Sequence, residues 1–258
     1  MKKTFLFPIA LIAVFVLIVG SACGFSIGKD ANETQEPEVI VITATPGVEV
    51  QQATQAPIVV VTEEPAVVDE AQPYFLEEFD GGLDNYWYDV WGTGNPDNVE
   101  IFTEDGALRF IHSGEDVYSY LYYDPYIYGD VRIDLEAENL ATNDNSVNIV
   151  CRYDEELGWY EYNIDNDGEW TLWYYDNVIY QGYKELYDGG STAINMGRDT
   201  NIYTVICQGD EMSLYINNVL TRVVENKDLK DGLIAIGVSS YASYPVKINI
   251  NWLEVSEP

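Results

Sequence analysis

The chain has 258 residues, of which 12 are Lys or Arg, 44 are Asp or Glu, one is His and three are Cys, and its formal net charge is −32. We expect no nucleic-acid partner, because phosphate binding requires clustered Lys and Arg. The single His and few Cys offer little to zinc, haem or iron–sulfur groups, whereas 47% hydrophobic residues are enough for a globular core.

Residues 1–22 have the pattern of a signal peptide: two lysines, an apolar run and then small residues. The Ser-Ala-Cys sequence that ends at Cys23 resembles a bacterial lipobox, although Gly20 stands where that pattern usually has Leu, Val or Ile. The resemblance implies cleavage before Cys23, lipidation of Cys23 and an extracytoplasmic protein anchored to the bacterial cell membrane. An uncleaved signal anchor remains open, because residues 4–22 are nearly long enough to span a bilayer.

Residues 23–73 differ in composition from the rest of the chain. Thr, Pro, Val and Glu dominate them, and they contain neither Trp nor Tyr. Two Val- and Ile-rich runs, 38–43 and 57–62, have strand propensity but lie next to prolines and have no aromatic side chain to pack on. We predict a disordered linker that holds the following domain away from the membrane. One of the runs adding an edge strand to that domain is the alternative.

Residues 74–258 are predicted to form an all-β domain. Short runs of alternating apolar and polar residues recur between Gly, Asn and Asp turns, a pattern typical of antiparallel hairpins. So many short strands indicate two antiparallel sheets packed as a sandwich. The predicted strands are Asn98–Thr103, Ala107–His112, Ser119–Tyr123, Asp130–Ala137, Ser146–Tyr153, Trp159–Ile164, Glu169–Tyr175, Val178–Gln181, Ile202–Gln208, Met212–Ile216, Thr221–Glu225, Leu233–Ser239 and Val246–Val255.

The order of motifs in this domain resembles the concanavalin A-like lectin/glucanase jelly roll. The motifs are Glu78-Phe-Asp-Gly-Gly-Leu83, Gly129-Asp-Val-Arg-Ile-Asp-Leu135, Gly158-Trp-Tyr-Glu-Tyr-Asn-Ile164, Met212-Ser-Leu-Tyr-Ile-Asn217 and Val246-Lys-Ile-Asn-Ile-Asn-Trp252. Within that class the chain is similar to laminin-G-like domains and to the domain of 3-keto-disaccharide hydrolases. The resemblance implies a jelly roll whose concave sheet face is often the binding face. It does not decide the activity, because one fold serves lectins, glucanases and structural modules.

Cys151 and Cys207 both lie in predicted strands, and lipidation would occupy Cys23. Because an exported domain meets an environment that permits disulfides, we predict a bond between Cys151 and Cys207. Two buried free thiols are the alternative.

Alternation along three consecutive predicted strands places one set of polar and aromatic side chains on a single sheet face. Sugar rings stack on Trp and Tyr, and their hydroxyls bond to amide, carboxylate and guanidinium groups, so this face is our candidate glycan-binding site. An ordinary solvated face with an Arg152–Glu161 pair is the alternative. The candidate residues are Asn148, Arg152, Trp159, Glu161, Asn163, Thr171, Trp173 and Tyr175.

The remaining candidates favour structural roles. The tyrosine run 118–128 is expected to pack over the end or edge of a sheet. Asp134, Glu136 and Glu138 share one strand face, but their order departs from the Glu-x-Asp-x-Glu row of jelly-roll glucanases, so we expect a solvated face and assign no catalytic residue. The acidic stretch 165–169 resembles a calcium loop but is expected to be a hairpin turn.

We therefore predict a membrane-anchored, extracytoplasmic lipoprotein whose jelly roll binds a glycan or polysaccharide. We expect no organic cofactor, while the similarity to laminin-G-like domains leaves a structural calcium ion open, at no identified site. Two alternatives stand beside this reading: a glycoside-acting hydrolase of the 3-keto-disaccharide hydrolase type, and a structural or protein-interaction domain without a small ligand.

Overall fold

The structure is a computed structural model that describes residues 71–141 and 144–258. All of these lie in the compact unit Glu64–Pro258. The predicted signal segment, Cys23 and residues 24–70 of the predicted linker lie outside the described residues. No helix among the described residues is long and apolar enough to cross a membrane.

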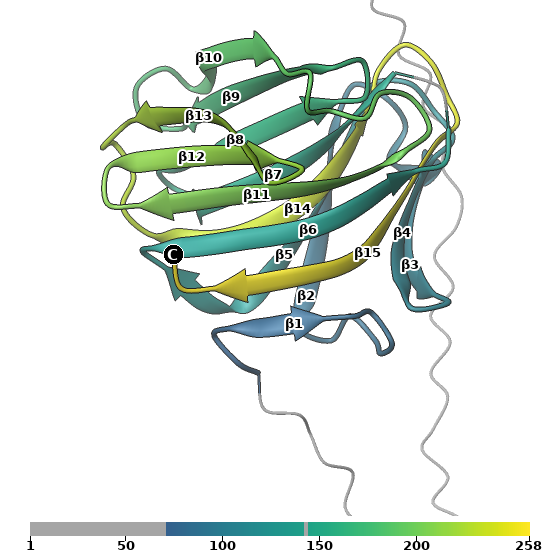
Figure 1. Cartoon of the computed structure of the whole chain (residues 1–258), viewed down its shortest axis with the longest axis horizontal. Helices are drawn as coiled ribbons and strands as arrows, with labels where there is room; N and C mark the ends of the chain where they lie inside the picture. Colours follow the sequence, from purple (N-terminus) through teal and green to yellow (C-terminus); the bar gives the residue numbers. More distant parts are fainter. Residues whose placement is uncertain (1–70, 142–143) are drawn as a thin grey trace, which may run out of the picture. The chain divides into compact units, whose positions relative to one another are not determined.

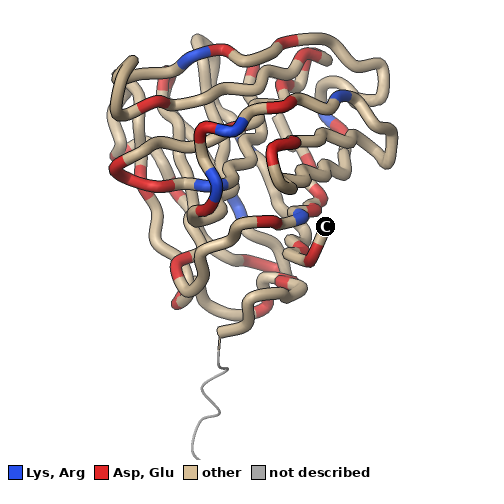
Figure 2. Tube along the Cα trace, turned by 90° about the vertical axis from the view of Figure 1, so that its left-hand side faces the viewer, with Lys and Arg blue, Asp and Glu red and all other residues tan. Residues whose placement is uncertain are grey.

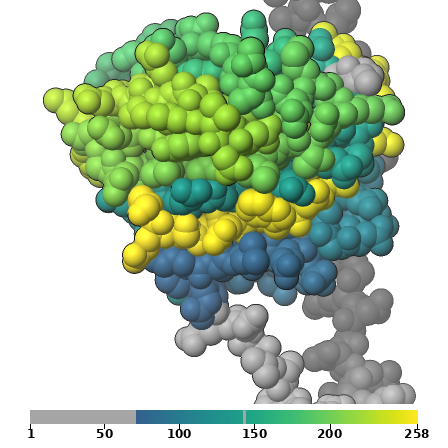
Figure 3. Space-filling model, viewed as in Figure 1, coloured from purple at the N-terminus to yellow at the C-terminus, as the bar shows by residue number. Residues whose placement is uncertain are grey.

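The described residues form two antiparallel sheets, the front one of which has eight strands (Figure 1). Its strand order is β13 (Val219–Glu225), β12 (Glu211–Ile216), β11 (Thr200–Gln208), β6 (Val131–Asn139), β15 (Val246–Ser256), β4 (Ala107–His112) and β3 (Val99–Glu104), and β1 (Phe75–Glu77) pairs with β15. A short 3₁₀ helix, Pro96–Asn98, leads into β3. In the space-filling view the bands of β13, β12, β11, β6, β15 and β1 lie side by side across this face (Figure 3).

The second sheet has seven strands and carries the predicted binding face. Consecutive hairpins build one half of it, and a long crossover brings the late strand into the middle. Its order is β10 (Gly182–Gly190), β9 (Glu169–Asp176), β8 (Gly158–Asp165), β7 (Asn145–Asp154), β14 (Gly232–Ser240), β5 (Val117–Tyr128) and β2 (Tyr86–Gly92). The two-sheet sandwich predicted from the alternating pattern is therefore confirmed.

Most predicted strands coincide with observed ones, but Val178–Gln181 is wrong. These residues form the loop between β9 and β10, and Ile179 at its tip is 88% exposed. The strand lies just after it, in a segment with few β-branched residues. β1 and β2 were not predicted.

The predicted hairpin turns are confirmed by the backbone. Asp105 and Gly106 both have positive φ, as do Asn217 and Asn218, the conformation that a two-residue turn requires. The acidic stretch 165–169 is the turn between β8 and β9, with Gly168 at φ +102°.

The main core fills the space between the two sheets. Val147 and Ile149 of β7 belong to the same cluster of buried side chains as Ile133 and Leu135 of β6. Cys151 belongs to the same cluster and forms the predicted disulfide with Cys207, which links β7 of one sheet to β11 of the other. The disulfide therefore joins the sheets across the core.

The row Asp134, Glu136 and Glu138 lies on the outer face of β6, because the alternate residues Ile133 and Leu135 point into the core. Arg132 donates to both carboxylate oxygens of Asp134, at 2.6 and 2.8 Å. The amides of Asn249 and Asn251 on β15 donate to Glu138 and Glu136, respectively. This face is thus an outer surface with cross-strand hydrogen bonds, on which Glu136 and Glu138 are half-buried. The expected solvation is wrong for Asp134, which is buried. Figure 2 shows such acidic residues along many strands and loops, with few basic ones between them.

Candidate functional site

The seven-stranded sheet curves strongly toward the face that carries the predicted binding residues. Trp91 of β2 and Trp159 of β8 are four strands apart in the sheet, which corresponds to about 19 Å at the usual strand spacing. Their ring centroids are nevertheless only 5.6 Å apart. The two sides of the sheet must therefore bend toward each other, and this face is concave.

Aromatic rings fill one end of the concave face. Trp159 stacks on Tyr175 at 4.1 Å between centroids and meets Trp91 and Tyr183 edge-on. Trp159 is only 3% exposed and belongs to a second buried cluster separate from the main core. This end of the face is packed, so Trp159 has no free ring face for a ligand.

The other end of the concave face holds a pocket of about 280 Å³. Small residues in the central strand make room for it, since Gly237 of β14 lies between Tyr120 of β5 and Asn148 of β7. A Cβ atom at Gly237 would approach the Tyr120 ring to 2.8 Å, so the glycine allows Tyr120 to lie across the sheet. The pocket is lined by Tyr118, Tyr120, Glu161, Asn163, Trp173, Tyr183, Ser239 and Tyr241.

Glu161 is the buried acidic group of this pocket, with 1% of its surface exposed. The hydroxyl of Tyr120 donates to Oε1 at 2.6 Å. The indole of Trp159 and the hydroxyl of Tyr183 both donate to Oε2, at 3.0 Å. Burial raises the pKa of Glu161 above its usual range, and these donors oppose that shift. The carboxyl group of Glu161 is therefore held in place by aromatic side chains on several sides.

Asn163 and Asp165 continue the row from Glu161 along β8, because every second residue shares a face. Asn163 lines the pocket, and its buried Oδ1 has no hydrogen-bond partner. Asp165 lies 2.9 Å from the hydroxyl of the pocket residue Tyr241. Burial, with the nearby charges of Asp167, Glu169 and Asp144, raises the pKa of Asp165 to about 6.

Three of the eight predicted binding residues, Glu161, Asn163 and Trp173, come together in the pocket. Four of the others share the concave face but do not line the pocket. The fifth, Arg152, does not lie on this face. Asn148 is fully buried, accepting from Ser146 and donating to Ser239, and Trp159 and Tyr175 stack on each other. Thr171 is half-buried and pairs with Asn163 across the strands.

The prediction that Arg152 lies on this face is wrong. A bulge between Cys151 and Asp154 interrupts the alternation, and Arg152 takes a left-handed conformation with φ +56°. Its guanidinium, 1% exposed, donates to the backbone carbonyls of Gly129, Gly209 and Leu229. Arg152 thus joins three loops, and the Arg152–Glu161 pair does not form.

The same bulge places Tyr153 on the concave face. There it packs against Trp87 at 6.1 Å and against Tyr122 at 4.5 Å between centroids. The expected alternation thus holds up to Cys151 and is reversed after it.

Sequence reasoning missed five lining residues: Tyr118, Tyr120, Tyr183, Ser239 and Tyr241. Tyr118 and Tyr120 lie in the tyrosine run that was predicted to cover an end or edge of a sheet. They share a face with Tyr122, and that face is the concave one. The remaining three come from β10, β14 and the residue after β14, whose places in the sheet no local pattern reveals.

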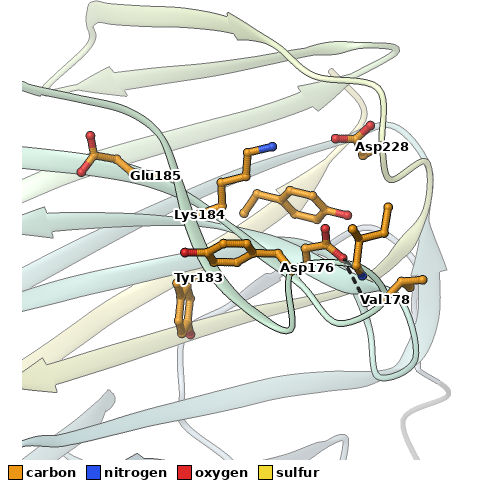
Figure 4. Close-up of a pocket in the computed structure, with 9 residues that line it drawn as sticks. Asp176, Val178, Tyr183, Lys184, Glu185 and Asp228 are labelled. Carbon is orange, nitrogen blue, oxygen red and sulfur yellow. Dashed lines mark hydrogen bonds between the residues drawn. The ribbon is translucent and has the colours of Figure 1, made fainter.

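A second, larger hollow of about 610 Å³ lies beside the pocket, and Tyr183 lines both. Figure 4 shows Lys184, Glu185 and Asp228 around this hollow, with Asp176 bonded to the backbone of Val178. Lys184, Glu185 and Asp228 are exposed. Asp176 is buried and accepts hydrogen bonds from two backbone N–H groups of the loop that follows it, so it caps its own turn. The buried carboxylate among these lining residues, Asp176, is thus occupied by its own turn.

Within the part of the chain that the structure describes, no group of three or more His, Cys, Asp or Glu side chains is placed to hold a metal ion.

No protein-family model matches the sequence, and no curated protein is similar enough in sequence to match it. Solved structures do match in fold. A GH16 enzyme of the mixed-linkage glucan system of Bacteroides ovatus, in complex with its G4G4G3G product, has a TM-score of 0.54 at 9% identity. The match covers 70% of this chain and 99% of that one.

Two further solved structures resemble this chain to a similar degree. A β-glucanase from Bacillus licheniformis has a TM-score of 0.51 at 15% identity, over 73% of this chain and all of that chain. The catalytic domain of an endo-1,3-β-glucanase from Thermotoga petrophila has a TM-score of 0.52 at 14% identity, over 72% and 98%. The concanavalin A-like jelly roll predicted from the motif order is therefore confirmed as the fold.

Proposed function

We propose that this chain is an extracytoplasmic lipoprotein, anchored to the membrane through Cys23, whose jelly roll binds a glycan in the concave pocket. The observation that carries the proposal is the composition of that pocket. Five aromatic side chains surround one buried carboxyl group and one amide with an unpartnered oxygen.

Each part of the pocket suits a sugar. The C–H faces of a pyranose ring stack on Trp173, which is half-buried and lies edge-on to Tyr183 at 6.0 Å. Sugar hydroxyls donate to Oδ1 of Asn163, an acceptor that is costly to leave unpaired away from water. The fold likeness supports the same ligand class, because two of the matched structures are described as glucanases.

Glycoside hydrolysis is the second candidate, and one observation favours it. Glu161 and Asp165 share a strand face, and burial raises the pKa of both, as a general acid requires. We rank it second because both oxygens of Glu161 are held by neighbouring donors. Residues four apart on a strand are also about 13 Å apart, more than the 5–10 Å between catalytic carboxyl groups, unless the side chains lean together.

The test is a glycan array with the chain from Gly24 onward, which retains every described residue. It is run with calcium and again with EDTA, so that a calcium-dependent site is detected as well. We expect a defined class of glycans to bind and Trp173→Ala to lose that binding. The control is Trp252→Ala, which removes the same residue type from β15 in the other sheet.

A folded sample that binds no glycan in either buffer contradicts the proposal and favours a structural or protein-binding domain. Release of reducing sugar from mixed-linkage glucan, lost in Asp165→Asn and Glu161→Gln, would instead support the second candidate.

A further inference from the structure

Glu161 is a buried carboxyl group without a positive partner. Its hydrogen-bond donors, Tyr120, Trp159, Tyr183 and the amide of Asn163, are all neutral. None of the five ion pairs among the described residues includes it. Buried charges in proteins are normally paired, because neutral donors only partly replace the hydration that a carboxylate loses. The missing positive charge is therefore the unusual feature of this pocket.

The sheet itself supplies no such charge. Arg152 and Lys184 are the only basic residues in the seven strands around the pocket. Arg152 is turned inside and bonded to three loops, and Lys184 lines the neighbouring hollow instead.

The surroundings of the pocket are acidic as well. A shallow groove of about 370 Å³ continues from the pocket, since Tyr118 and Tyr241 line both. Glu115 and Asp116 lie in this groove, and no Lys or Arg lines either part among the described residues.

The walls of the pocket favour an organic cation. The side chains of Tyr118, Tyr120, Trp173, Tyr183 and Tyr241 form an aromatic box, and the negative faces of such rings attract ammonium groups within about 6 Å. A metal ion fits less well. Calcium takes about six to eight oxygen ligands, and here a single carboxylate is already held by four neutral donors.

We infer that the pocket binds the ammonium group of an amino sugar within its glycan ligand, with Glu161 as the counter-charge. This inference rests on the proposed function and specifies its ligand: a polysaccharide with unacetylated 2-amino-2-deoxy sugar residues. The aromatic box contacts both the sugar face and the cation, and the acidic groove attracts further ammonium groups along the chain. The same groove disfavours polysaccharides of uronic acids by like-charge repulsion.

The experiment compares three hexasaccharides that differ at one position of the sugar, by calorimetric titration of the chain from Gly24 onward. They are the hexamers of glucosamine, of N-acetylglucosamine and of glucose, β-1,4-linked, at a pH at which the amines are protonated. We expect the glucosamine hexamer to bind at least about tenfold more tightly than the other two. This preference should shrink when salt rises from about 0.05 to about 0.5 M, because salt screens the charges. Choline serves as an ammonium probe without a sugar.

Two matched variants assign the effect. Glu161→Gln removes the charge and keeps a hydrogen-bond acceptor, so the preference for glucosamine should fall to within about twofold. Glu185→Gln removes an exposed carboxylate opposite Trp173 that does not line the pocket, and should leave the preference unchanged. The comparison of the three hexamers on the unmodified chain does not depend on the folding of either variant.

Equal or tighter binding of the glucose or N-acetylglucosamine hexamer overturns this inference and leaves the proposed function intact. Choline binding as tight as the glucosamine hexamer overturns the assignment to a sugar. If no glycan binds here or on the array, the proposed function itself fails.

Discussion

Replacing Arg152 by Met tests whether this residue is structural, as its geometry indicates, or part of a binding face, as alternation alone predicted. Its guanidinium is 1% exposed and donates to the carbonyls of Gly129, Gly209 and Leu229, at 3.2, 2.8 and 3.0 Å. Hydrogen bonds from charged groups contribute about 1.5–3 kcal/mol each, and Met offers no donor to the three carbonyls left behind. Burial of the Met side chain offsets part of this loss. We expect the free energy of unfolding to fall by about 4 kcal/mol.

The assay is urea unfolding followed by tryptophan fluorescence, with the m-value checked to remain constant. Arg109→Met is the matched control, because Arg109 forms only surface ion pairs with Glu104 and Asp105 and should change stability by less than about 1 kcal/mol. A loss below about 1 kcal/mol for Arg152→Met would refute the assigned role.

Four further predictions concern the disulfide, the pH dependence of stability at two residues, and the anchor. Replacing Cys151 and Cys207 together by Ala opens a loop of 56 residues and should lower the free energy of unfolding by about 4 kcal/mol in the chain-entropy model; unchanged urea midpoints would contradict this. Burial lowers the pKa of His112 to about 4, so stability should rise with pH between about 4 and 6.5 by about 1.4 kcal/mol per unit, and His112→Gln should remove this contribution. The pKa of Asp165 is raised, so this residue favours folding below about pH 4 and loses that contribution as pH rises to about 6. The stability of Asp165→Asn relative to the unmodified chain should therefore increase over this range. For His112 or for Asp165, stability curves of the variant and the unmodified chain that run parallel with pH would refute the prediction. The unmodified protein should take up lipid label and Cys23→Ser should abolish it, whereas an uncleaved signal anchor would leave the unmodified protein unlabelled as well.

The fold could be predicted from the sequence because its signals are local. Alternation and turn residues act over a few positions, and pairs such as Asp105 with Gly106 allow the backbone that a tight hairpin needs. The segment that forms β10 lacks a clear alternation of apolar and polar residues. The adjacent Val178 and Ile179 have strand propensity, but they lie at an exposed loop tip. Propensity therefore placed the strand a few residues too early.

The site was predicted only in part, because its geometry depends on curvature and on one bulge. Alternation placed Glu161, Asn163 and Trp173 on one face, and the structure brings them into one pocket. It could not show that the face is concave, which buries Trp159 under rings from distant strands. Nor could it reveal the extra residue in β7 that turns Arg152 inward.

The most direct test of the glycan-binding pocket is an NMR titration that follows the indole N–H signals of the six tryptophans. The ligand is the glycan that binds best on the array. Trp173 lines the pocket, Trp170 packs in the main core and Trp252 lies on the other sheet. Binding at the proposed site should shift the signal of Trp173 and leave those of Trp170 and Trp252 in place. A glycan that binds while the Trp173 signal does not move would contradict the assignment of the pocket.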